Sequence, residues 1–242
     1  MNNMIFSSVL FTTITLIYAI VKYFVTKDQK QQNAKLYLAI YLVLVLVSQF
    51  FINLSATNNI CGTNQPVVAV MTTIFPWTFI FGSLFVLLMV FPGWKVPFSN
   101  TFGYLVAKLS GIQKVFSNIL LPESSNKALA QVYEDNSLII NEITPSNFEN
   151  FWNNFSKSRF LNKGADKFKN QLYNLVNMKD IVSETVWYLL TGNVVLSVTE
   201  NHLSNIKCKR SVEQLKEQHE EWEKNNNKTE KKEERKTYFV RD

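Results

Sequence analysis

The sequence predicts an all-α membrane protein: three transmembrane helices, then a mostly helical cytosolic domain and a charged, disordered tail. Two observations support this fold class. Three long apolar runs occupy most of the first 91 residues, and charge is distributed very unevenly along the chain. Residues 1–94 hold one acidic and four basic side chains, whereas residues 95–242 hold 18 acidic and 21 basic ones. We therefore expect a membrane-embedded part and a polar part, joined near Trp94.

The three apolar runs are each long enough to cross a bilayer, which takes about 20 residues of helix. Residues 5–25 contain one charge, Lys22, close to the end of the run, and residues 36–54 and 67–91 contain none. An ionised side chain near the bilayer centre would cost about 2.5–3.5 kcal/mol, so charge-free runs of this length are typical of transmembrane helices. The first run lacks the basic start and the cleavage site of a signal peptide, which is the competing interpretation.

Pro76 and Gly82 lie inside the third apolar run and predict a kink. Such a kink is tolerated in a membrane where a neighbouring helix satisfies the freed carbonyl group. None of the three runs has an ionisable residue near its middle, which argues against a conduction path.

Lysines predict the orientation of the chain through the positive-inside rule. The connection between the first two spans carries a cluster of four: Lys22, Lys27, Lys30 and Lys35. The second connection, residues 53–66, carries none. We expect a lumenal N-terminus and a cytosolic C-terminal domain. With three spans, Cys61 and Cys208 would lie on opposite sides of the membrane, unable to pair with each other, and Cys61 could form an intermolecular disulfide.

Residues 95–121 are predicted to form an amphipathic juxtamembrane helix, because apolar residues recur there at spacings of three and four. Ser99 is the expected N-cap. Residues 101–104, TFGY, are similar to part of a potassium-channel filter. No convincing span follows them, so we interpret them as the first turn of this helix. The expected anchors at the membrane interface are Trp94, Lys95, Phe98, Phe102 and Tyr104. The pattern leaves open whether the helix lies in the interface or packs on the cytosolic domain.

Residues 122–210 predict the helical cytosolic domain, in which residues 128–143 fit either a strand or short helices. A helical pattern beginning at residue 146 places four aromatic residues on one side, a candidate partner-docking face, although such stripes more often belong to a core: Phe148, Phe151, Trp152 and Phe155. Residues 181–198 could be a fourth span. Glu184 and the polar residues 191–193 favour instead a buried core helix or a helical hairpin. Residues 211–242 predict a charged helix and a disordered tail.

The composition offers little for catalysis. The chain has two cysteines and two histidines, whereas a structural zinc site needs four such ligands. The motifs of nucleotide-binding proteins, serine hydrolases and zinc proteases are missing from the sequence. We expect no enzyme activity, no cofactor, no metal and no nucleic-acid partner.

The run IFPWTFIFGSLFVLLMVFPGWKVPFSNTFGYLVAKLSG, residues 74–111, resembles a membrane protein of the nucleocytoplasmic large DNA viruses. WYLLTGN, residues 187–193, and the region around Cys208 are similar to the same group. The resemblance implies a structural protein of the virion inner membrane, which derives from host endoplasmic reticulum. It would anchor capsid or assembly proteins through its cytosolic-side domain, with the lipid bilayer and a further copy of itself as other partners. The alternative function is that of a pore-forming or transport membrane protein.

Overall fold

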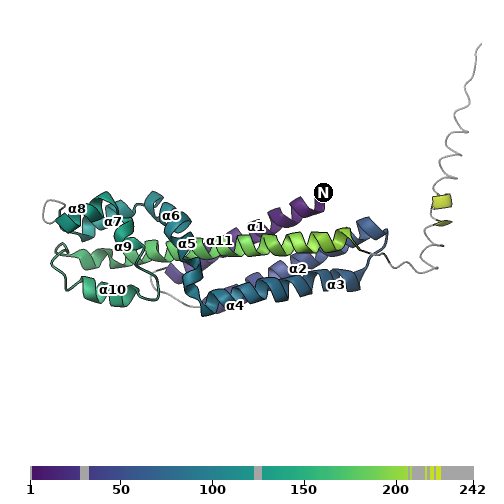
Figure 1. Ribbon diagram of the computed structural model, residues 1–242, viewed down its shortest axis with the longest axis horizontal. Coiled ribbons are helices and arrows are strands. Elements are labelled where there is room, and N and C mark those ends of the chain that lie inside the picture. Colours follow the sequence, from purple (N-terminus) through teal and green to yellow (C-terminus); the bar gives the residue numbers. More distant parts are fainter. Residues whose placement is uncertain are drawn as a thin grey trace, which may run out of the picture.

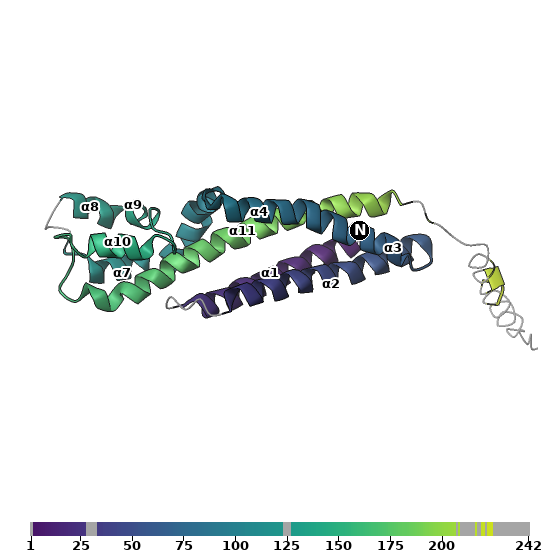
Figure 2. The same cartoon turned by 90° about the horizontal axis from the view of Figure 1, so that it is seen from below.

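The computed structural model describes residues 2–27, 33–122, 127–206, 208, 216, 219–220 and 222–224, and this part of the chain is helical without a β-strand. Figures 1 and 2 show an elongated molecule in which long helices run side by side and short helices gather at one end. The predicted all-helical class is therefore confirmed for the described residues. The charged helix and disordered tail expected over residues 211–242 lie almost entirely outside them.

Four helical segments of the described chain are long and apolar enough to cross a membrane. Three of them match the predicted spans: α1 (Asn2–Thr26), α2 (Ala34–Cys61), and the continuous segment of α3 (Pro66–Pro76), η2 (Trp77–Phe81) and α4 (Gly82–Val90). The fourth is α11 (Lys169–Ser204), which runs without a break through residues 191–193. The prediction of a hairpin at these residues is wrong, and the three-span prediction is not confirmed. Gly192 does not break α11, because it packs directly against the Phe11 ring of α1.

Helices α1 and α11 form an antiparallel pair with contacts along its whole length. These contacts join Ser8 with Asn193, Phe11 with Gly192, Lys22 with Glu184, and Thr26 with Asn177. A Cβ atom on Gly192 would lie 2.1 Å from the buried ring of Phe11. The glycine in the polar centre of α11 thus serves close helix–helix packing, as small residues commonly do between transmembrane helices.

The third segment contains a π-helical turn directly after Pro76, where the sequence predicts a kink. Proline has no N–H, so it leaves the carbonyl oxygen of Thr72, four residues earlier, without its helical donor. The Thr199 hydroxyl on α11 donates to this oxygen at 3.2 Å, and the π-helical turn η2 follows directly. A neighbouring helix therefore satisfies the freed carbonyl group, which is the condition under which a membrane span tolerates a proline.

The short helices lie at the end of the bundle where α1 ends and α11 begins (Figure 2). They are η3 (Pro92–Lys95), α5 (Val96–Phe98), η4 (Ser99–Gly103), α6 (Tyr104–Leu109), α7 (Ile112–Ile119), α8 (Lys127–Glu134), α9 (Ser137–Ile140), α10 (Phe148–Phe155) and η6 (Ala165–Phe168). The single helix predicted over residues 95–121 is interrupted at Gly111, whose φ of 93° favours glycine. Ser99 is not an N-cap, because it has helical φ and ψ angles. Helices α8 and α9 confirm the short-helix alternative for residues 128–143.

Two hydrophobic cores share α11. The first, which we call the head core, is formed by the short helices together with the first turns of α11, and includes Phe116, Ile140, Phe148, Leu172 and Val176. The second fills the bundle and includes Phe11, Tyr41, Trp77, Phe81 and Tyr188. The head, defined here as residues 104–178, is therefore joined to the bundle by one continuous helix.

Candidate functional site

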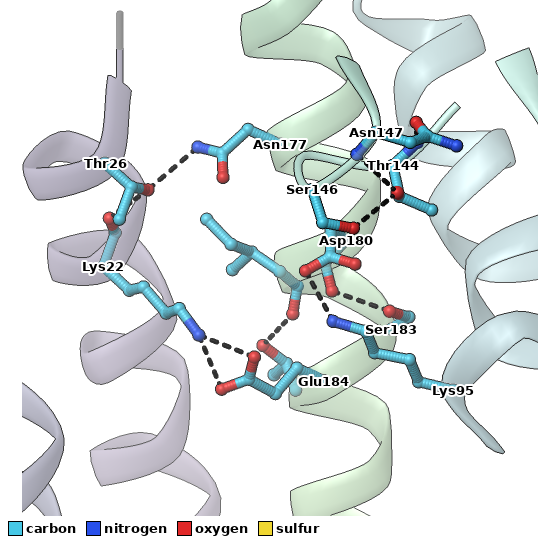
Figure 3. Close-up of polar contacts among 12 residues, drawn as sticks. Lys22, Thr26, Lys95, Thr144, Ser146, Asn147, Asn177, Asp180, Ser183 and Glu184 are labelled. Carbon is cyan, nitrogen blue, oxygen red and sulfur yellow. Dashed lines mark hydrogen bonds and ion pairs between the residues drawn. The ribbon is translucent and has the colours of Figure 1, made fainter. Parts of the chain in front are cut away.

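An ion pair joins α1 to α11 within the candidate membrane spans (Figure 3). The Lys22 Nζ lies 2.7 Å from Glu184 Oε1 and 2.6 Å from Oε2, and the Tyr188 hydroxyl donates to Oε1 at 2.8 Å. The side chains of Lys22 and Glu184 are 21% and 12% exposed. Lone charges in such surroundings are costly, and pairing with further hydrogen bonds offsets much of that cost.

Aromatic side chains surround this ion pair in the bundle. Tyr41 stacks with Tyr18 at a ring-centroid distance of 4.5 Å and with Tyr188 at 5.9 Å. The hydroxyls of Thr15 and Tyr41 lie 3.2 Å apart within hydrogen-bonding distance. Three helices, α1, α2 and α11, therefore meet in one polar and aromatic layer around Glu184.

A second ion pair marks the joint between bundle and head. Lys95 Nζ donates to Asp180 Oδ2 at 2.7 Å, one helical turn before Glu184 on α11. The rings of Trp94 and Phe98 each lie 6.0 Å from that of Trp187. Three of the five predicted interface anchors thus gather around α11, where each contacts a residue of that helix.

The other two predicted anchors have different surroundings. Phe102 is 53% exposed, whereas Tyr104 packs against the head core. Burial raises the pKa of the Tyr104 hydroxyl above its ordinary value, with a smaller contribution from the carboxylate of Asp135.

The tetrapeptide at residues 101–104 packs against α11 at the joint between head and bundle. A Cβ atom on Gly103 would stand 2.5 Å from the backbone oxygen of Lys179, so only glycine allows the two backbones to approach this closely. Lys179 is itself buried, and its Nζ donates to the side-chain oxygens of Asn100 at 3.2 Å and Asn141 at 3.3 Å. The glycine that suggested a filter loop instead fixes the joint between head and bundle.

An apolar groove of about 420 Å³ opens between α8 and α10 in the head. Its lining includes Leu129, Val132, Ile139, Phe151, Phe155 and Phe160. The predicted docking face is therefore divided between two environments. Phe148 and Trp152 are buried in the head core, whereas Phe151 and Phe155 stack at 5.0 Å and line the groove.

The remaining predicted site residues are the topology lysines. Lys22 is paired with Glu184 rather than extended toward the interface, and Lys27 and Lys35 are exposed. Lys30 lies outside the described residues. These three topology lysines, Lys22, Lys27 and Lys35, lie at the head end of the bundle, where α1 ends and α2 begins.

A disulfide joins Cys61 to Cys208, with their Cα atoms 5.5 Å apart. The expectation that these cysteines cannot pair is wrong, and no thiol is left for the suggested intermolecular bond through Cys61. The error followed from placing α11 in a separate domain. Because α11 returns along the bundle, its end lies beside the end of α2, at the opposite end of the molecule from the head (Figure 1).

Sequence reasoning missed the functional candidates on α11. Glu184 was interpreted as evidence against a span, and its pairing with Lys22 was not foreseen. A detectable signal existed, because an isolated acid and an isolated base each lay near the end of an otherwise apolar run. Glu184 lies in the fourth candidate span, which is not one of the three runs predicted from the sequence.

Among the described residues, no group of three or more metal-ligating side chains gathers in one place. The contacts at this site are hydrogen bonds and ion pairs between helices of the bundle. In comparisons with known proteins, no family model, no curated protein and no solved structure matches the chain.

Proposed function

We propose that this protein is a structural membrane anchor that presents its head to capsid or assembly proteins of a large DNA virus. The observation that carries the proposal is the continuity of α11. Its first turns are buried in the head core and its later turns in the bundle core, so the head and the bundle are built on one shared helix. In this account all four candidate spans cross the bilayer.

The proposed orientation places the head on the cytosolic side and both termini in the lumen. The lysines of the first connection and the head support it through the positive-inside rule. The Cys61–Cys208 disulfide supports it independently, because disulfides persist in oxidising compartments such as the endoplasmic reticulum lumen. Resemblance of residues 74–111 to a viral membrane protein supports the assignment to a virion inner membrane.

The groove between α8 and α10 is the proposed docking site on the head. Its volume falls within the range of ordinary binding pockets, about 300–1,000 Å³, and its aromatic lining suits the apolar side chains of a protein partner. Three exposed basic residues are sequence neighbours of residues that line the groove: Lys127, Lys157 and Arg159. The partner surface is therefore expected to combine an apolar centre with an acidic edge.

Quantitative mass spectrometry of purified virions tests this proposal. Asn154→Trp places a large side chain in the groove lining, whereas Gln113→Trp changes an exposed position on α7 and serves as the matched control. We expect to find the wild type and the control in virions, cross-linked to capsid proteins. The groove variant should remain in infected-cell membranes and lose its cross-links to capsid proteins. Absence of the wild-type protein from virions, while infected-cell membranes contain it, would contradict the structural role.

Transport is the second candidate function, and the Lys22–Glu184 pair favours it. Ionisable residues within membrane spans often mark ion or proton pathways. Recordings from planar bilayers containing the purified protein test this candidate. A conductance that Glu184→Gln abolishes would support transport, and a silent bilayer would remove it.

A further inference from the structure

The outward face of α11 carries an amide near the middle of the bundle. The exposed residues on this face follow a helical spacing: Leu190, Asn193, Val194 and Ser197. We call these four residues the α11 stripe. Asn193 lies nine residues beyond Glu184, which corresponds to about 14 Å along the helix. Residues 185–199 carry no charged side chain, and Asn193 lies near the middle of this stretch, so it lies close to the bilayer centre in the proposed orientation.

Other outward faces of the bundle differ from the α11 stripe in chemistry. They are dominated by large apolar side chains, such as Leu16 and Ile20 on α1, and Val43 and Val47 on α2. Exposed hydroxyls also occur, but a hydroxyl can bond the carbonyl of its own helix, as Thr13 does with Val9. An exposed amide has more hydrogen-bonding groups than its own helix can satisfy.

Among the described residues, two other amides of the bundle, those of Gln49 and Asn53, are buried and bonded to neighbouring helices. Gln49 accepts a hydrogen bond from Ser7 at 2.6 Å, and Asn53 donates one to Thr73 at 2.7 Å. Asn193 donates to the Leu189 carbonyl at 2.7 Å and accepts from Ser8 at 3.1 Å. An asparagine side chain can make four hydrogen bonds. Asn193 is exposed, so its amide can also bond to a partner outside the molecule.

We infer that the α11 stripe is a self-association face, through which α11 of one copy packs against α11 of a second copy. Two copies in one membrane share the same orientation, so a two-fold axis along the membrane normal brings identical residues together at the same depth. An amide is both donor and acceptor, which makes Asn193 complementary to itself across such an axis. Polar side chains of this kind drive association between membrane helices, where the hydrophobic effect supplies little.

Cysteine cross-linking in native membranes tests the pairing directly. Both natural cysteines are held in the disulfide, so an introduced cysteine provides the free thiol. Val194→Cys changes the stripe without removing Asn193, and Val47→Cys on α2 is the matched control, since the two valines are 52% and 47% exposed. We expect an oxidant to convert Val194→Cys to a dimer on a non-reducing gel at least fivefold more than Val47→Cys.

A second variant separates a specific pairing from random collision. Asn193→Leu in the Val194→Cys background is expected to reduce dimer formation several-fold, whereas Asn193→Gln keeps the amide and is expected to preserve it. The Cys61–Cys208 bond should stay intact in each variant, which reports correct folding. Equal cross-linking at residues 194 and 47, cross-linking to a different protein, or no effect of Asn193→Leu would each overturn the inference.

Discussion

Lys22 Nζ lies 2.6 Å from Glu184 Oε2 and links the first long helix of the chain to the last, across 162 residues of sequence. This pair, together with the disulfide at the other end of the bundle, fixes α11 alongside the N-terminal helices. The head is consequently held by a helix that is joined to the bundle at Glu184, near its middle, and at Cys208, just beyond its end.

Breaking the Lys22–Glu184 pair is predicted to destabilise the bundle. Lys22→Met leaves the Glu184 carboxylate buried without its cation, and Glu184→Gln leaves the Lys22 ammonium group similarly unpaired. Each should lower the free energy of unfolding by about 3 kcal/mol, the lower end of the range for breaking buried pairs. Thermal unfolding of the detergent-solubilised protein measures the change.

The double variant of the same two residues is predicted to recover more than half of that loss, because no unpaired charge remains. Lys169→Met supplies the control. It breaks an exposed pair with Glu149, which should cost less than about 1 kcal/mol. Strictly additive single losses would show that the charges act independently of each other.

Gly103→Ala is predicted to loosen the joint between head and bundle. The added Cβ would meet the Lys179 backbone at 2.5 Å, and helix backbones cannot give way as a flexible side chain can. Overpacking of this kind typically costs about 1–3 kcal/mol. Gly93→Ala is the control, since a Cβ there has no neighbour within 4 Å. Equal melting temperatures for the two variants would contradict the close approach.

The hydrogen bond from Thr199 to the Thr72 carbonyl predicts an effect that depends on Pro76. Thr199→Val keeps the shape of the side chain but leaves the carbonyl unsatisfied, at a cost of about 1–2 kcal/mol. Pro76→Ala restores the missing N–H, so the threonine should matter less in that background. A double-mutant cycle by thermal unfolding measures the coupling, and a coupling energy of zero would rule out this role for Thr199.

The sequence was sufficient for α1, α2 and the α3–α4 segment, because apolar runs with no central charge leave few alternatives to a span. It was insufficient for α11, where Glu184 and Asn193 interrupt the apolar pattern. The partners that make these residues acceptable, Lys22 and Ser8, are 162 and 185 residues away. No local pattern reports such a pairing, so the polar residues counted against the helix that contains them.

The predicted partner-docking face shows the same difficulty at smaller scale. Periodicity correctly placed Phe148, Phe151, Trp152 and Phe155 on one helix. It could not tell which of them face the core and which line the groove, because that depends on where α8 packs. Residues 101–104 are helical, as predicted, but the glycine among them is explained by its contact with Lys179, far away in the sequence.

The disulfide predicts the reactivity of the two cysteines. The oxidised protein should not react with a membrane-impermeant maleimide, and after reduction it should gain two labels when the reagent is on the lumenal side. Labels appearing before reduction, or a disulfide-linked dimer of the wild type on a non-reducing gel, would be incompatible with the Cys61–Cys208 bond. Cys208→Ser is the control and should expose one thiol at Cys61.

In the proposed topology, α11 crosses the membrane and separates the head from the C-terminal tail. Two of the three natural glycosylation sequons, at Asn154 in the head and at Asn227 in the tail, allow a direct measurement. Translation with endoplasmic-reticulum microsomes should add a glycan that Asn227→Gln removes and Asn154→Gln leaves in place. A glycan lost in Asn154→Gln would contradict this account, as would a tail that stays unmodified even with a further acceptor sequence added after Asp242.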